Sequence, residues 1–312
     1  DWIALLKPRV MSLVIFTGLC GLLAAPGAIH PVIAFTAILC IAVGAGGAAA
    51  LNQWWEADID AGMKRTMSRP LPGGRMRRED ARDFGIFLSA VSLVLMGVAV
   101  GWLASALLLL AIIYYAVIYT MWLKPRTPQN IVIGGVAGAI PPLVGAAAAT
   151  GHLGLSSWWL FALVMVWTPA HFWALALLLR EDYRAVGIPM LPVVKGTAAT
   201  ARGISVYAAL TVVLSLLGVW ALPSGGLLYG LLLLPFNARL IQMAWRLHQD
   251  PDDVQRARGL FRWSILYLFG ICLLLLLARL PAGAVLSSQG WDLLALAGSG
   301  KAGFTLAAAV AA

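Results

Sequence analysis

Long apolar stretches alternate with short polar segments along most of the chain. An apolar stretch of about 20 residues can cross the hydrocarbon core of a membrane as a helix, which pairs its backbone groups internally. The pattern therefore predicts an all-α polytopic membrane helical bundle with about nine transmembrane helices. The predicted spans cover residues 10–28, 31–55, 84–102, 104–122, 131–150, 157–179, 204–222, 226–247 and 261–280.

The polar segments divide the predicted spans into two similar four-helix halves plus one helix. Each half has a charged loop between its second and third spans, and each loop contains acidic residues and prolines. Membrane proteins built from repeats often place their site between the repeats. We predict one intramembrane domain over residues 1–282, followed by an Ala- and Gly-rich C-terminal tail, 283–312, of unknown structure.

Composition supports the membrane assignment, and the charge pattern predicts an orientation. The 312-residue chain is 61% hydrophobic and 11% charged, a balance that a water-soluble domain does not tolerate. Its net charge of +9 does not indicate nucleic-acid binding, because the basic residues gather in alternate loops as the positive-inside rule requires. We expect a bacterial inner membrane, with the N-terminus and the charged loops in the cytoplasm and the basic face against anionic lipid.

The strongest candidate site lies at the end of the second predicted span. Asn52, Glu56 and Asp60 are spaced by four residues, so a helix would place them near one face over about 12 Å. Carboxylates at the mouth of a membrane helix are costly and usually functional. Crowded carboxylates need a cation, and these oxygen ligands suit Mg²⁺. A solvated loop that ends the helix is the alternative interpretation.

A basic segment follows this motif directly. We predict that Lys64, Arg65 and Arg69 bind phosphate, because two guanidinium groups four residues apart can contact one diphosphate through paired hydrogen bonds. Anchoring at the membrane surface is the competing explanation. We favour that explanation for Arg75, Arg77, Arg78 and Arg82.

Two further candidates belong to the second half. Asp182 lies in the second charged loop, whose parallel with the first loop favours a functional role over a solvated one. His171 lies in the sixth predicted span, about 13 Å from its charged end. The nearby Pro169 frees backbone groups that membrane proteins tolerate where a cavity is present. A hydrogen-bonded core histidine is an equally good interpretation of His171.

The order of the motifs resembles the UbiA-type intramembrane prenyltransferases, and among them those that act on haem. The superfamily motif Asn-x-x-x-Asp-x-x-x-Asp matches Asn52, Glu56 and Asp60, with Glu in place of the middle Asp. Ala170 also departs from the family, which usually has a second Pro there. The segments that match the haem-specific members are 6–10, 58–61, 63–66, 69–70, 127–135, 138–142, 167–169, 171–175 and 182–192.

The resemblance, which covers about residues 4–280, implies a reaction and a site. A farnesyl group would pass from farnesyl diphosphate to a vinyl group of haem B, with addition of water, giving haem O and diphosphate. Lys64, Arg65 and Arg69 would bind diphosphate, and His171 would contact haem. The expected Mg²⁺ ligands, which would also be catalytic, are Asn52, Glu56, Asp60 and Asp182.

Other assignments remain open. Lys7, Arg9 and Lys124 are candidates to bind the haem propionates, and haem A synthase or a terminal oxidase are candidate protein partners. The alternative functions are a prenyltransferase for another aromatic acceptor, such as a quinone precursor, and a non-catalytic haem transporter or assembly factor. The sequence lacks the motifs of P-loop nucleotide hydrolases, zinc proteases and serine hydrolases.

Overall fold

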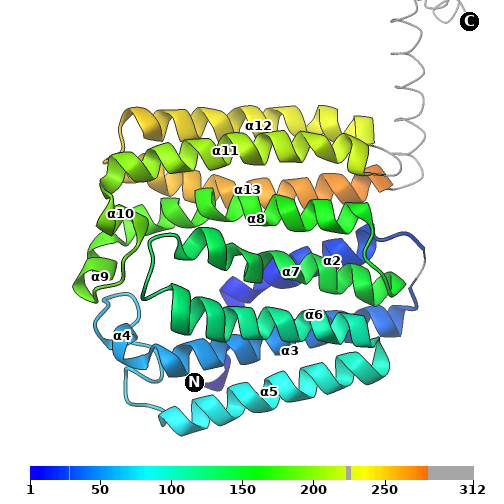
Figure 1. Cartoon of the computed structure of the whole chain (residues 1–312), viewed down its shortest axis with the longest axis horizontal. Helices are drawn as coiled ribbons and strands as arrows, with labels where there is room; N and C mark the ends of the chain where they lie inside the picture. The colour runs from blue at the N-terminus through cyan, green and yellow to red at the C-terminus, as the bar shows by residue number, and fades with distance from the viewer. Residues whose placement is uncertain (28, 223–225, 280–312) are drawn as a thin grey trace, which may run out of the picture.

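The computed structural model describes residues 1–27, 29–222 and 226–279, which form a helical bundle without strands (Figure 1). The predicted tail 283–312 lies outside these residues. The long helices are α2 (Pro8–Ala24), α3 (Pro31–Trp55), α5 (Arg78–Ala99), α6 (Trp102–Ile113), the π-helix η1 (Tyr114–Leu123), α7 (Asn130–Thr150), α8 (Leu155–Leu178), α11 (Gly196–Ala221), α12 (Gly226–Gln249) and α13 (Val254–Arg279). The short helices are α1 (Trp2–Leu5), α4 (Ala57–Ala61), α9 (Arg180–Ala185) and α10 (Leu191–Val194).

These helices make the chain a multi-pass membrane protein. Within the described ranges, 8 helices are long and apolar enough to span, if α6 and η1 count as one, and the 17-residue α2 is a shorter apolar helix beside them. Three helices begin six to eight residues earlier than predicted, at Arg78, Gly196 and Val254. The apolar pattern missed these first turns because they carry polar side chains on helices that continue beyond the predicted span.

The predicted division into two halves is confirmed by the packing. Helix α2 packs on α3, α3 on α5, α5 on α6, and α6 on α7. The same order is repeated by α7, α8, α11, α12 and α13. The halves meet where α2 packs on α7, and Figure 1 shows α3, α5 and α6 on one side of this pair and α8, α11, α12 and α13 on the other.

Glycines allow α2 and α7 to approach closely. A Cβ atom at Gly21 would lie 2.1 Å from the carbonyl oxygen of Pro142, and one at Gly145 would lie 2.0 Å from the carbonyl oxygen of Gly18. Such distances are far below van der Waals contact. Small residues therefore hold the central contact between the halves together, as is common in membrane bundles.

Replacing Gly145 by Ala is expected to destabilise the protein by about 3 kcal/mol, because overpacking a tight contact forces the backbones apart. Thermal unfolding in detergent measures the loss. The matched control is Gly138→Ala on the same helix, where a Cβ atom would meet nothing within 4 Å. Equal melting temperatures for the two variants would contradict this account of the α2–α7 contact.

Candidate functional site

The first acidic motif keeps a helical register although the helix is interrupted. Helix α3 ends at Trp55, and Glu56 has φ −88° and ψ 8° before α4 begins. The N–H of Glu56 still donates to the carbonyl oxygen of Asn52 at 3.0 Å, and that of Asp60 donates to the carbonyl oxygen of Glu56 at 2.7 Å. These bonds keep the three side chains at helical spacing, and all three are buried.

The side-chain amide of Asn52 makes hydrogen bonds to Lys7, near the N-terminus, and to Thr120 in the π-helix η1. The ammonium of Lys7 donates to Asn52 Oδ1, and Asn52 Nδ2 donates to Thr120 Oγ1 at 2.9 Å. Lys7 has a φ of 51° and is the only non-glycine residue with positive φ in the described ranges. This backbone conformation is uncommon for a residue with a side chain, and it occurs where the Lys7 ammonium contacts Asn52. Burial and the positive charge of Arg69, partly opposed by Glu56, lower the pKa of Lys7 to about 7.

Glu56 forms an ion pair with Lys124. The Lys124 Nζ atom lies 2.5 Å from Glu56 Oε1, and the two side chains are only 14% and 4% exposed. Burial disfavours the ammonium, but the charge of Glu56 outweighs it and raises the pKa of Lys124. Lys124 directly follows η1, and π-helical turns are frequently found at functional sites. The π-helix η1 therefore ends next to the lysine that pairs with Glu56.

Asp60 is paired with one of the predicted phosphate ligands. Arg69 Nη1 lies 2.6 Å from Asp60 Oδ2, and Thr66 Oγ1 donates to the Asp60 carbonyl oxygen at 2.8 Å. The loop after α4 therefore folds back over its own acidic helix. The nearby Asp58 differs, because its side chain is 83% exposed and pairs with Arg78 at 2.9 Å.

The other predicted phosphate ligands stand at the rim. The side chains of Lys64 and Arg65 are exposed, and neither makes a hydrogen bond or ion pair with the described part of the chain. They are available to an anion from outside, whereas Arg69 is already engaged by Asp60.

The two charged loops pack against each other, at the end of the bundle that holds α4, α9 and α10 (Figure 1). A Cβ atom at Gly62 would lie 2.7 Å from Cγ1 of Val186, and Met63 belongs to the same apolar cluster as Tyr183. Asp182 is half-buried and makes no hydrogen bond or ion pair with other described residues. The structure brings the second loop to the site, but Asp182 does not join the paired residues.

The oxygen donors of the first acidic motif suit a Mg²⁺ ion that is bound together with phosphate. Among the described residues, no three His, Cys, Asp or Glu side chains are grouped to hold a metal ion. Mg²⁺ needs less, because one or two carboxylates, several waters and substrate phosphates usually bind it. The buried carboxylates of Glu56 and Asp60, beside the amide oxygen of Asn52, fit an ion that arrives with a diphosphate.

His171 is fixed on three sides. Its ring stacks between Trp167 and Phe261, with ring centroids 4.4 and 4.8 Å away, and its Nδ1 lies 2.7 Å from Ser264 Oγ. The Ser264 hydroxyl donates its one hydrogen to the Phe261 carbonyl oxygen at 2.7 Å, so we assign the hydrogen of the shared bond to Nδ1. Nε2 then keeps its lone pair at the remaining edge of the ring.

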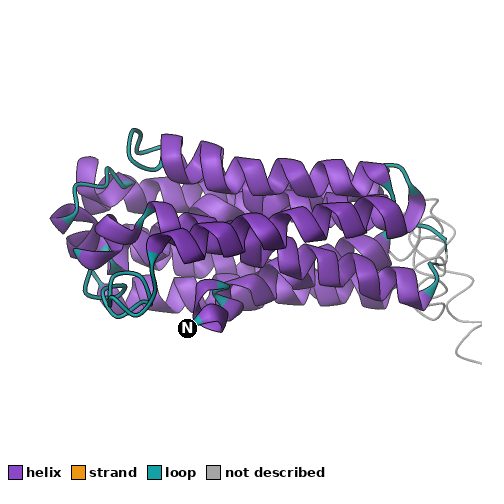
Figure 2. Cartoon of the chain, turned by 90° about the horizontal axis from the view of Figure 1, so that it is seen from below, coloured by secondary structure: helices purple, strands orange, loops and turns teal. Residues whose placement is uncertain are grey.

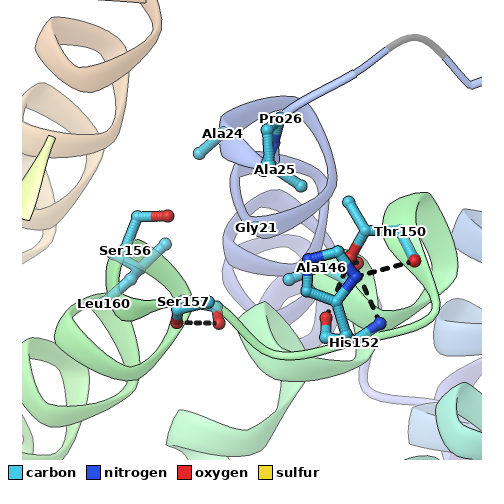
Figure 3. Close-up of a pocket in the computed structure, with 11 residues that line it drawn as sticks. Gly21, Ala24, Ala25, Pro26, Ala146, Thr150, His152, Ser156, Ser157 and Leu160 are labelled. Carbon is cyan, nitrogen blue, oxygen red and sulfur yellow. Dashed lines mark hydrogen bonds between the residues drawn. The ribbon is translucent and has the colours of Figure 1, made fainter. Parts of the chain in front are cut away.

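A small pocket lies at the opposite end of the bundle (Figure 3). The ends of α2 and α7 and the start of α8 line it, and His152 there bonds to Thr150. Its volume of about 10 Å³ is close to that of one water molecule. Figure 2 shows the helices lying side by side between two sets of loops. The pocket lies where α7 ends and α8 begins, whereas Glu56 lies between α3 and α4 at the other end of the bundle (Figure 1). This pocket is too small for a substrate.

Some of these contacts involve residues that the sequence did not mark as site residues. Thr120 and Ser264 were not predicted, and Lys7 and Lys124 were predicted only as candidates for the propionates. One signal was available, since the tripeptide Lys-Pro-Arg occurs both at 7–9 and at 124–126. Spacing along the chain could not show that both lysines meet the same motif.

Known proteins match this chain over most of its length. Residues 13–266 match the model of the UbiA prenyltransferase family. A protein of Erythrobacter litoralis named protoheme IX farnesyltransferase is 59% identical over 275 residues, 87% of this chain and 89% of that protein. One of the same name from Prochlorococcus marinus is 57% identical, covering 96% and 91%. The structure of a UbiA homologue from Archaeoglobus fulgidus bound to DMAPP and Mg²⁺ matches with a TM-score of 0.66 at 14% identity, covering 87% of this chain and 99% of that one.

Proposed function

The chain belongs to the UbiA prenyltransferase family, and on that premise we propose that it transfers the farnesyl group of farnesyl diphosphate to a vinyl group of haem B. Addition of water completes the product, haem O, and diphosphate is released. The relatives that share more than half of their residues with this chain carry the name of this activity. They favour haem over a quinone precursor as the acceptor, and an enzyme over a transporter.

One observation carries the proposal in the structure. Three polar oxygens at the mouth of an apolar bundle each contact a cationic side chain, namely Asn52 with Lys7, Glu56 with Lys124 and Asp60 with Arg69. Buried charges need such partners. A diphosphate that entered with a metal ion would offer anionic oxygens to the same cations and leave the carboxylates to the metal.

The residues can then be given roles. Asn52, Glu56 and Asp60 would hold Mg²⁺, with Asp182 from the second loop as a further ligand. Bound there, the ion would neutralise charge on the departing diphosphate. Arg69, Lys124 and Lys7 would bind phosphate oxygens from inside the site, and the exposed Lys64 and Arg65 would bind them from the rim. These fixed cations would stabilise the leaving group as the carbon–oxygen bond breaks.

Contact with the membrane explains how one site can bind two hydrophobic substrates. The bundle presents large apolar side chains on its outside, among them Phe35 and Trp220, which suits contact with lipid. A farnesyl chain could lie in the bilayer while its diphosphate reaches the charged end. We propose that this end faces the cytoplasm of a bacterial inner membrane, and that the product passes to a haem A synthase or a terminal oxidase.

An assay with purified protein tests the function. Detergent-solubilised protein is given farnesyl diphosphate and haem B with and without Mg²⁺, and the products are read by mass spectrometry. A haem product heavier by farnesyl plus water, formed only with Mg²⁺, is expected. Release of diphosphate with an aromatic acid but not with haem B would keep the metal site and reject the acceptor.

His171 is proposed to bind haem through its free Nε2 edge. His171→Phe keeps an aromatic ring between Trp167 and Phe261 but removes the nitrogen, so haem affinity is expected to fall about tenfold while farnesyl diphosphate affinity stays unchanged. Titration of the Soret band measures the first, and competition with labelled farnesyl diphosphate the second. An unchanged Soret titration would make His171 a packing residue.

A further inference from the structure

A basic groove lies between the second half of α12 and the start of α13. Figure 1 shows α12 and α13 side by side in the bundle. It has a volume of about 250 Å³. The residues that line it are Arg239, Met243, Arg246, Gln255, Arg256 and Gly259. None of them takes part in the proposed transfer reaction, so the groove needs its own explanation.

The positive charge of the groove is only partly balanced. Arg256 pairs with Asp253 at 3.0 Å and lies 3.9 Å from Asp250. Arg239 donates only to the neutral amide oxygen of Gln242, at 2.5 Å. The guanidinium of Arg246 makes no hydrogen bond or ion pair with any part of the chain that the structure describes. Among the described residues, two cations of α12 therefore lack an anionic partner.

The position of Arg239 along α12 shows toward which end of the bundle this charge lies. Helix α12 is a candidate membrane span that ends at Gln249, so Arg239 lies about 15 Å before its end at 1.5 Å per residue. The groove places Arg239 level with Gly259, near the start of α13, so its charge lies toward the end of the bundle that carries the charged loops. The Arg239 guanidinium contacts Gln242, about one turn nearer that end, and lipid phosphates lie at the level of the charged loops of a membrane protein.

The apolar surface beyond the groove shows which kind of anion fits. Leu232 lies seven residues before Arg239 on α12, and Leu266 lies seven residues after Gly259 on α13, so each continues the face that lines the groove. Their side chains are 43% and 57% exposed. A ligand with a phosphate and long apolar chains would contact the arginines and these leucines together.

We propose that this groove binds the phosphate of an anionic phospholipid, with the acyl chains along Leu232 and Leu266. Paired N–H groups of a guanidinium match two oxygens of a phosphate. Basic pockets between membrane helices on the charged side of a protein bind anionic headgroups in this way. The phosphate could also come from solution as inorganic phosphate, and the experiment separates these sources.

The test compares lipid binding by the solubilised full chain, measured by native mass spectrometry with phosphatidylglycerol and with phosphatidylcholine of the same acyl chains. Wild-type protein is expected to prefer phosphatidylglycerol. The double variant Arg239→Gln/Arg246→Gln should weaken its binding about thirtyfold, since each basic side chain near an anionic headgroup contributes about fivefold and two contribute the product. Arg239→Lys/Arg246→Lys keeps the charge and should retain most of the preference.

The matched control is Arg202→Gln/Arg258→Gln, which removes the same charge at exposed positions outside the groove. It should change affinity by no more than about twofold. An equal loss in this control, or equal binding of both lipids, would show general surface attraction and overturn the proposal. Competition by inorganic phosphate, with no advantage for phosphatidylglycerol, would assign the groove to free phosphate instead. Circular dichroism of each variant shows whether it is folded.

Discussion

Replacing Asp60 by Asn is expected to slow farnesyl transfer by a factor of about 10² to 10³ while the protein stays folded. The substitution keeps the size of the side chain and an oxygen for Arg69, which lies 2.6 Å away, but it removes the negative charge. If Asp60 helps to hold the ion that neutralises the leaving diphosphate, loss of that charge removes stabilisation needed mainly in the transition state. Removing one such electrostatic contact typically has an effect of this size.

The control is Asp58→Asn in the same short helix. Asp58 is exposed and pairs with Arg78 at the surface, so its variant should keep nearly full activity. Turnover is measured with both substrates saturating over a range of Mg²⁺ concentrations, and thermal unfolding checks the fold. Full turnover by Asp60→Asn at saturating Mg²⁺ would reject the metal assignment, and equal losses in both variants would point to a general effect of charge on α4.

The architecture could be predicted because a membrane leaves few choices to the chain. Apolar length predicts the helices, and the two matching charged loops predict two halves, which meet where α2 packs on α7. The first acidic motif was also readable, since four-residue spacing in a helix places Asn52, Glu56 and Asp60 near one face. The backbone bonds from Glu56 and Asp60 preserve this register through the break between α3 and α4.

Partners from distant parts of the chain could not be predicted in the same way. Lys7 and Lys124 reach the motif from 45 and 68 residues away, and this depends on how α2 and η1 pack against α3. In a sequence, a lysine at the end of a span looks like a membrane anchor. The sequence does not show whether its ammonium contacts a carboxylate or a lipid. The tautomer of His171 likewise depends on Ser264, which lies 93 residues away. Nothing in the sequence marks this serine as a partner of the histidine.

Replacing Lys124 by Met should test whether its pairing with Glu56 is structural, catalytic or both. The variant leaves a buried carboxylate without its partner, and breaking a buried pair from one side costs about 3 kcal/mol. The expected result is a lower melting temperature in detergent together with loss of transfer. The control Arg184→Met breaks the exposed pair with Glu181 in α9 and should cost less than about 1 kcal/mol.

The double variant Glu56→Gln/Lys124→Met separates the two effects. Removing both charges eliminates the unpaired carboxylate, so most of the lost stability should return. Transfer should not return, because Glu56 is proposed to hold Mg²⁺ and Lys124 to bind the diphosphate. A stable double variant that regained wild-type turnover would show that the pair is only a structural contact. A Lys124→Met variant as stable as wild type would show that the pair is not buried. The combination of restored stability with absent turnover is therefore the result that would assign this ion pair to the reaction.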